Sequence, residues 1–129
     1  MKKWIYVFGL FTLSLGAIAQ VVTIDPPFPT INDDVTITFN AAEGNGALTN
    51  IVPVYAHTGV IFDNNLSDWQ NVQPPGPDVF TSPNPDVFMD VVGSNTHQIS
   101  YNIAEFYGLN GDENVTQLSF VFRNGIGSI

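Results

Sequence analysis

Short runs in which apolar and polar residues alternate, each bounded by turn-forming residues, recur along this chain. The clearest run covers residues 35–39, where alternation places Val35, Ile37 and Phe39 together on one face of an extended strand. No stretch has the apolar periodicity of a helix of ordinary length, and no internal repeat is visible. The pattern therefore predicts an all-β protein.

Six or seven short strands are expected, separated by Gly, Pro, Asn and Asp. Such spacing is typical of an immunoglobulin-like β-sandwich. A turn follows the last strand and no further strand is given, which favours either the front piece of a longer protein or a natural truncation. In both cases the sandwich would lack its last strand and have an open edge. The expected strands are residues 21–24, 35–39, 52–61, 87–92, 96–103 and 118–123, with one helical turn within 104–109 and a proline-rich surface loop over 73–85.

The start of the chain has the pattern of an export signal. Two lysines precede an apolar core, residues 4–15, and a small-x-small cleavage site follows at Ala17–Ala19. The apolar run is short for a membrane span. We therefore expect residues 1–19 to be a cleaved signal peptide and residues 20–129 to be one secreted or periplasmic domain, with no membrane partner after cleavage.

The charge balance disfavours several classes of partner. Removal of the signal would leave Arg123 as the only Lys or Arg beside 12 acidic residues, a formal charge of −12 + 1 = −11. Nucleic acid and anionic membrane surfaces would be repelled. The sequence has no cysteine, so thiol catalysis, thiolate zinc sites and disulfides are excluded, and the core must be held by packing alone.

Tyr55, His57 and Trp69 are the candidate binding residues. In a strand over residues 52–61, alternation places Tyr55 and His57 side by side, with Trp69 a short loop away. Flat rings stack on the apolar faces of sugars, and a neutral imidazole exchanges hydrogen bonds with hydroxyl groups. The same three side chains can equally close the edge of the core. The residues alone leave both interpretations open.

No catalytic motif is present. The acids lie mostly in turns, without the pair of carboxylates in a cleft that glycoside hydrolysis needs, and no nucleophile elbow or phosphate loop occurs. We expect neither an enzyme nor a cofactor. His57 and His97 lack the spacing of metal ligands, so no metal residue is predicted. The oxygen-rich run Asp63–Asp68 lacks an EF-hand pattern; a solvated turn is favoured, and calcium binding there stays open.

Arg123 has two interpretations. The favoured one is an ordinary ion pair, which contributes little to stability if it is exposed and more if it is desolvated. In the other, Arg123 locks the last strand to a neighbouring acidic loop or to a following domain.

Several pieces of the sequence, taken in combination, resemble a known protein module. They are PFPT (27–30) with DDVTITF (33–39), VYAHTGVI (54–61) and FVFRN (120–124). Together these pieces resemble the immunoglobulin-like, starch-binding-type N-terminal domain of secreted amylase-family proteins of the Bacteroidetes. Members usually continue past the last piece into a catalytic domain or a sorting tail.

The resemblance implies a secreted, non-catalytic accessory module that binds α-glucan. Tyr55 and Trp69 would stack on the sugar, and His57 would supply a polar contact. The alternative is a structural immunoglobulin-like spacer that packs against the following domain and binds no sugar. Exposure of the three rings would favour the first alternative, and burial would favour the second.

Overall fold

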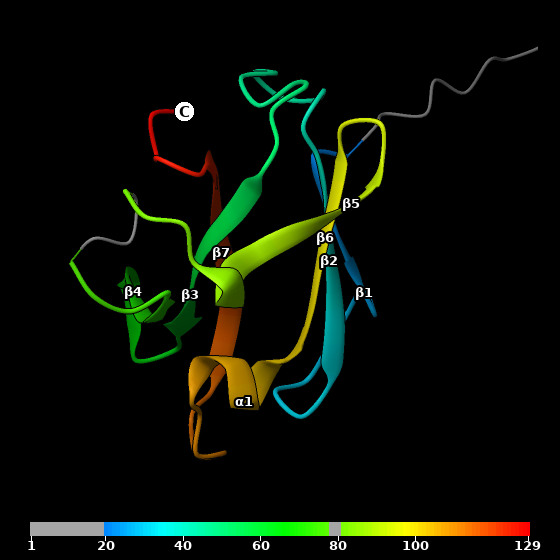
Figure 1. Ribbon diagram of the computed structural model, residues 1–129. Helices are drawn as coiled ribbons and strands as arrows, with labels where there is room; N and C mark the ends of the chain where they lie inside the picture. The colour runs from blue at the N-terminus through cyan, green and yellow to red at the C-terminus, as the bar shows by residue number, and fades with distance from the viewer. Residues whose placement is uncertain (1–19, 78–80) are drawn as a thin grey trace, which may run out of the picture.

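The computed structural model describes residues 20–77 and 81–129, so the expected signal peptide lies outside the described residues (Figure 1). Within this part of the chain nearly every regular element is a strand, which confirms the all-β class. The elements are β1 (Val22–Asp25), β2 (Asp34–Asn40), β3 (Val54–Phe62), β4 (Asn65–Gln73), a 3-10 turn η1 (Pro85–Val87), β5 (Phe88–Gly93), β6 (Thr96–Asn102), a helix α1 (Ile103–Tyr107) and β7 (Val115–Asn124).

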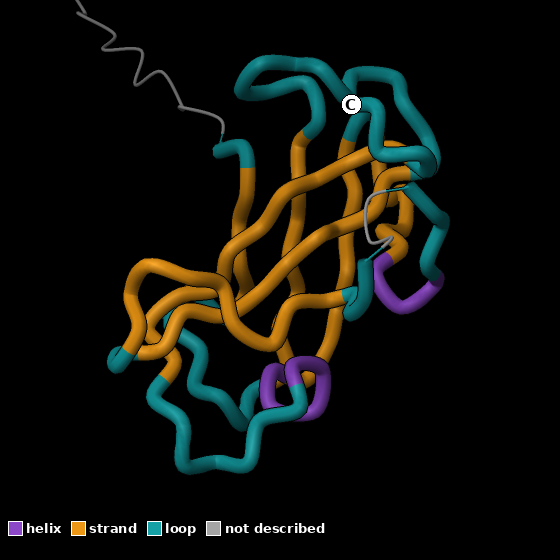
Figure 2. The backbone as a smooth tube through the Cα atoms, turned by 90° about the vertical axis from the view of Figure 1, so that its left-hand side faces the viewer, coloured by secondary structure: helices purple, strands orange, loops and turns teal. Residues whose placement is uncertain are grey.

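The strands belong to a single antiparallel sheet that curls on itself. Neighbours follow the order β1-β2-β6-β5-β3-β4, and β7 pairs with β3. The start of β5 pairs with β3 and its remainder pairs with β6, so β5 joins the two halves of the sheet. Figure 1 shows β1, β2 and β6 on one side and β3, β4 and β7 on the other, and Figure 2 turns the side of β3, β4 and β7 towards the viewer. The two separate sheets of an immunoglobulin-like sandwich stay a prediction.

The hydrophobic core lies between the two halves of the curled sheet. The predicted inward residues of β2 are all buried, and the ring of Phe39 stacks on Phe122 of β7 with centroids 4.1 Å apart. This contact brings the inner faces of the two halves together, because β2 and β7 belong to different halves. The buried cluster comprises Val35, Ile37, Phe39, Ala41, Leu48, Val54, Ala56, Val60, Met89, Ile99, Ile103 and Tyr107.

Helix α1 closes one end of this core. The side chain of Asn102 accepts the Glu105 N–H at the start of the helix, and Gly108 ends it with φ of 64°. Tyr107 is almost fully buried, and its hydroxyl lies 2.7 Å from Thr58 Oγ1 and 3.0 Å from the Tyr101 hydroxyl. The helix therefore fastens β6 to the middle of β3.

Both faces of β3 are buried, including the face for which the sequence left open a packed edge or a binding patch. All residues from Val54 to Ile61 are buried. Strand β4 twists over the outer face of β3 at Gly59, where an added Cβ would lie only 3.1 Å from the Gln70 carbonyl oxygen and 3.2 Å from the Trp69 Cβ. Glycine at position 59 lets β4 approach this closely, because a side chain there would force β4 to shift.

Strand β4 itself was not expected. Residues 62–70 were predicted to be a polar connection, but a tight turn at Asp63 and Asn64 leads directly into β4 at Asn65. The prediction failed because β4 has no clear apolar alternation. Its backbone pairing with β3 defines it as a strand, and Trp69 therefore belongs to the sheet. No helix within the described residues is long and apolar enough to cross a membrane.

Candidate functional site

The structure brings Tyr55, His57 and Trp69 onto the outer face of β3 but covers two of them. Tyr55 is 7% exposed and His57 is 8% exposed, while Trp69 is half-buried. The imidazole of His57 stacks on the Trp69 indole with centroids 5.8 Å apart and planes at 26°. The Phe88 ring meets the Tyr55 ring edge-on at 5.8 Å. The three rings therefore do not form an exposed platform, and of the three only Trp69 is accessible to a ligand.

Arg123 is the residue that covers Tyr55. Its guanidinium carbon lies 5.1 Å from the centroid of the Tyr55 ring. Nη1 donates to the Asn124 carbonyl and Nη2 to the Ser82 carbonyl, each at 3.0 Å. The Ser82 contact ties the proline-rich loop to β7. A sugar ring cannot reach this face of Tyr55 unless Arg123 moves away.

Arg123 is not exposed at the surface, and the ion pair predicted for it stays a prediction. The side chain is 1% exposed, and its described partners are an aromatic ring and two carbonyl oxygens. Desolvation lowers the pKa of the guanidinium, while the nearby Tyr55 raises it. The only sequence signal for this role was that Arg123 is the single Lys or Arg after residue 19. Its pairing with Tyr55 in the sheet is a tertiary property.

The two histidines are held in the neutral form. Burial lowers the pKa of His57, and the positive charge of Arg123 lowers it further. Burial alone lowers the pKa of His97, which lies in the other half of the sheet beside Phe39. Among residues 20–77 and 81–129, no group of three or more His, Cys, Asp or Glu side chains is arranged to hold a metal ion.

The oxygen-rich run Asp63–Asp68 spans the β3–β4 turn. Asp63 Oδ2 accepts a hydrogen bond from Asn114 Nδ2 at 2.9 Å. Asn65 Oδ1 accepts from the N–H and the hydroxyl of Ser67. These oxygens stabilise the turn and link it to the start of β7.

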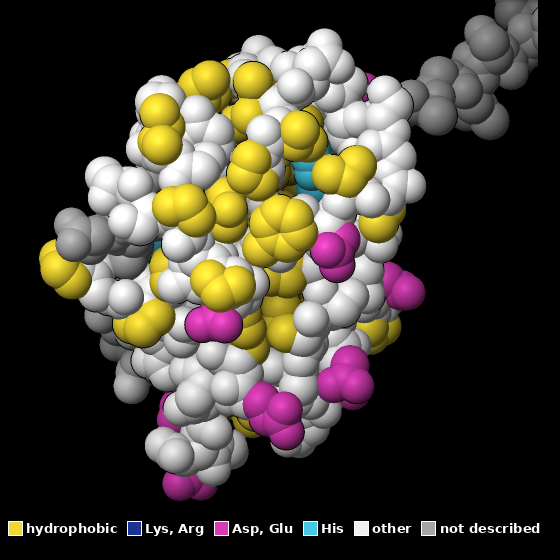
Figure 3. All heavy atoms as spheres, in the orientation of Figure 1, with side chains coloured by type: hydrophobic (Ala, Val, Ile, Leu, Met, Phe, Trp, Pro, Cys, Tyr) yellow, Lys and Arg dark blue, Asp and Glu magenta, His cyan; other side chains and the backbone are white. Residues whose placement is uncertain are grey.

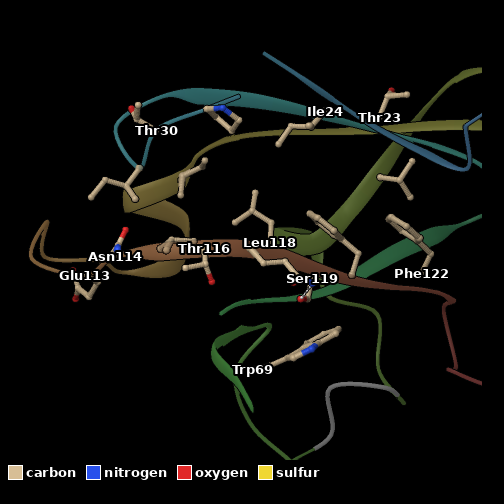
Figure 4. Close-up of a pocket in the computed structure, with 17 residues that line it drawn as sticks. Thr23, Ile24, Thr30, Trp69, Glu113, Asn114, Thr116, Leu118, Ser119 and Phe122 are labelled. Atoms are coloured by element: carbon tan, nitrogen blue, oxygen red, sulfur yellow. Dashed lines mark hydrogen bonds between the residues drawn. The ribbon is translucent and has the colours of Figure 1, made fainter. Parts of the chain in front are cut away.

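A groove of about 880 Å³ lies between β1 and β7, and no sequence pattern pointed to it (Figure 4). Figure 4 shows Leu118 and Phe122 extending from β7 towards Ile24 on β1, while Ser119 and Trp69 lie on the opposite side of β7. The groove floor is apolar and its rim is polar. Its lining comprises Val22, Thr23, Ile24, Pro29, Thr30, Ile31, Trp69, Ile103, Phe122 and residues 113–120.

The surface carries apolar and acidic groups but no exposed cation after residue 19, because Arg123 is buried. Strand β5 exposes Phe88, Val91 and Val92. Figure 3 shows hydrophobic side chains gathered over the middle of the face that β5 crosses, with acidic side chains towards its lower part.

No protein-family model matches the chain, and no curated protein matches its sequence.

Proposed function

We propose that this chain is a non-catalytic structural module of an exported protein, which packs against a further polypeptide and does not depend on sugar binding. The observation that carries the proposal is the burial of Tyr55 beneath Arg123. A sugar platform needs open ring faces, and here the rings hold the loop around Ser82 and strand β4 against β3.

The state of the carboxylates supports a non-catalytic role. The N–H and hydroxyl of Thr30 donate to Asp33 Oδ2, and these bonds lower the pKa of Asp33. The backbone N–H groups of Asn110 and Gly111 donate to Glu113, whose pKa is lowered as well. A general acid in glycoside hydrolysis needs a raised pKa, so neither group is suited to that task.

A second candidate function is weak binding of α-glucan, as the resemblance implies. One observation favours it: Trp69 lines the groove and lies on the same side of β7 as Ser119 (Figure 4). In this version Trp69 alone stacks on sugar. His57 supports the indole from beneath, and Tyr55 acts only through packing.

The two candidates separate in a fluorescence titration. The full chain with Trp4→Phe keeps Trp69 as its only tryptophan. We expect that soluble starch and maltoheptaose leave the emission of this protein unchanged while circular dichroism shows it folded. A saturable change in emission, together with starch binding in calorimetry that is lost in Trp69→Phe but persists in the matched surface variant Val121→Ala, would overturn the structural proposal in favour of glucan binding.

A further inference from the structure

The free edge of β7 is the most unusual feature of the described sheet. This strand is ten residues long, and within residues 20–77 and 81–129 it pairs with β3 alone. The N–H of Asn124 points away from β3 and donates to the Ile129 carbonyl at 3.2 Å. Because alternate residues of a strand direct their backbone groups to the same edge, Phe122, Phe120 and Leu118 also present an N–H and a C=O to the free edge.

The intervening residues of β7 direct their backbone groups towards β3, in agreement with this alternation. The Ser119 carbonyl accepts the Thr58 hydroxyl at 2.6 Å, so Ser119 faces β3. Backbone groups along the free edge thus recur at every second residue, which is the spacing that another extended backbone matches. A saccharide has no such repeat of donors and acceptors.

The groove lies where the curled sheet fails to close, between the edges of β1 and β7. Strand β1 pairs only with β2 among the described elements, and β1 and β7 line opposite walls of the groove. Every pair along β1-β2-β6-β5-β3-β7 is antiparallel, so β1 and β7 run in opposite directions. A strand added antiparallel to β7 therefore runs parallel to β1 and lies between the two.

The floor of this gap consists of apolar side chains that the fold leaves only partly buried. Ile24, Leu118, Phe120 and Phe122 pack against the buried cluster yet stay only partly buried, and all four line the groove. A strand that lies over them can place every second side chain on this apolar floor. Its burial would remove apolar surface from water on both partners.

The charge of the chain identifies the kind of partner. Residues 20–129 carry 12 acids and one buried arginine, so a second copy would bring like charge to the groove. Glu113 lies at the rim, and Asp25 ends the neighbouring strand β1. Lysines or arginines at the outward positions of the added strand would instead meet an acidic surface.

We propose that the groove between β1 and β7 binds an extended segment of another polypeptide, which adds to β7 as an antiparallel strand. Apolar residues at alternate positions face Leu118, Phe120 and Phe122, and basic residues face outward. The inference deepens the proposed structural role and rests on it, because it names the polypeptide that the module holds.

The test uses the full chain and synthetic peptides of about eight residues, a length that matches an ordinary strand. In the first peptide Val and Ile alternate with Thr and Lys. The second has the same sequence with methyl groups on the backbone nitrogens that would face β7. The third has the same composition with the alternation scrambled. Fluorescence anisotropy of the labelled peptides should show saturable binding of the first alone, since only it combines the apolar pattern with free backbone donors.

Amide exchange followed by NMR identifies the binding edge. The amides of Leu118, Phe120 and Phe122 should exchange at least about tenfold more slowly when the first peptide is bound. The amides of Ser119 and Val121 face β3 and should not change. Leu118→Ala should weaken binding about tenfold, whereas Val121→Ala, on the outer face of the same strand, should leave it unaltered.

Equal binding of the methylated peptide, or protection elsewhere than at these three amides, would contradict strand addition. A dimer in light scattering that excludes the peptide would replace the proposed partner with a second copy. Lack of peptide binding by folded protein overturns the inference. The proposed structural role is still supported in that case if starch leaves the Trp69 emission unchanged. If Trp69 does respond to starch, both the inference and the structural role fail.

Discussion

The guanidinium of Arg123 lies 5.1 Å from the centroid of the Tyr55 ring. The two residues face each other on the paired strands β7 and β3. The same guanidinium donates to the Ser82 carbonyl, so one side chain joins β3, β7 and the proline-rich loop. The Ser82 carbonyl is thereby held on the sheet by a charge that is almost fully buried. This arrangement explains why the only arginine of the chain contributes to the fold rather than to the surface.

Replacement of Arg123 by Ala should destabilise the protein by about 2–3 kcal/mol. The variant loses the contact with the Tyr55 ring and two charge-assisted hydrogen bonds to carbonyl groups. Arg123→Lys should lose less unfolding free energy than Arg123→Ala, because the ammonium keeps the charge although it lacks the planar fork of donors. Urea unfolding measures all of these values. Tyr55→Phe keeps the ring and should remain within about 0.5 kcal/mol of the parent; an Arg123→Ala protein as stable as the parent would contradict the assigned role.

Gly59 sets the distance between β3 and β4. In Gly59→Ala the new methyl would lie 3.1 Å from the Gln70 carbonyl oxygen and 3.2 Å from the Trp69 Cβ, so β4 must shift. We expect a loss of about 1–3 kcal/mol of unfolding free energy together with a changed Trp69 emission spectrum. Gly93→Ala is the matched control, because its nearest contact would be an ordinary 3.6 Å. A stable Gly59→Ala protein with unchanged emission would mean that β4 does not press on β3.

The contrast between β2 and β3 shows what could be predicted from the sequence. Strand β2 buries one face, so its alternation identified both the strand and its inward residues. Strand β3 is buried on both faces, and its alternation therefore could not decide between the two interpretations of Tyr55 and His57. The absence of any charged residue from Val54 to Phe62 was the available signal, since strands covered on both sides are apolar throughout.

Other features could not have been found in a local pattern. Strand β4 is polar, and its pairing with β3 is a tertiary property. The groove exists because β1 and β7 come together as walls of one gap, although about ninety residues separate them along the chain. The expected missing last strand stays a prediction; within the described part of the chain β7 pairs with β3 alone.

The hydroxyl of Tyr107 is a junction between two elements of the core. It lies 2.7 Å from Thr58 Oγ1 and 3.0 Å from the Tyr101 hydroxyl. Tyr107→Phe should cost about 1–2 kcal/mol because it leaves the buried Thr58 and Tyr101 each with one partner fewer. Tyr101→Phe should cost less, since the bond between Tyr107 and Thr58 remains. Urea unfolding of both variants and of the double variant gives the coupling, which would be absent if the three hydroxyls acted independently.

The histidines predict how stability changes with pH. Burial lowers the pKa of both His57 and His97 below the ordinary value of 6.5. Between the lowered folded pKa and 6.5 the unfolded chain binds more protons than the folded one, so unfolding is favoured as the pH falls. Stability should be fully present above about pH 7 and should decline as the pH falls through 6.5 towards the folded values. Urea unfolding of the parent and of a variant with both histidines changed to Gln measures this decline, which should be much smaller in the variant.

Arg123 should account for part of the His57 shift and for none of the His97 shift. Its charge lowers the pKa of His57 in addition to burial, whereas burial alone acts on His97. In Arg123→Met the side chain keeps much of its volume but loses its charge, so the pKa of His57 should rise towards the ordinary value. NMR titration of the two imidazole rings measures both groups in one sample, and His97 serves as the internal control. A His57 pKa that is the same in the parent and in Arg123→Met would show that burial alone keeps this ring neutral.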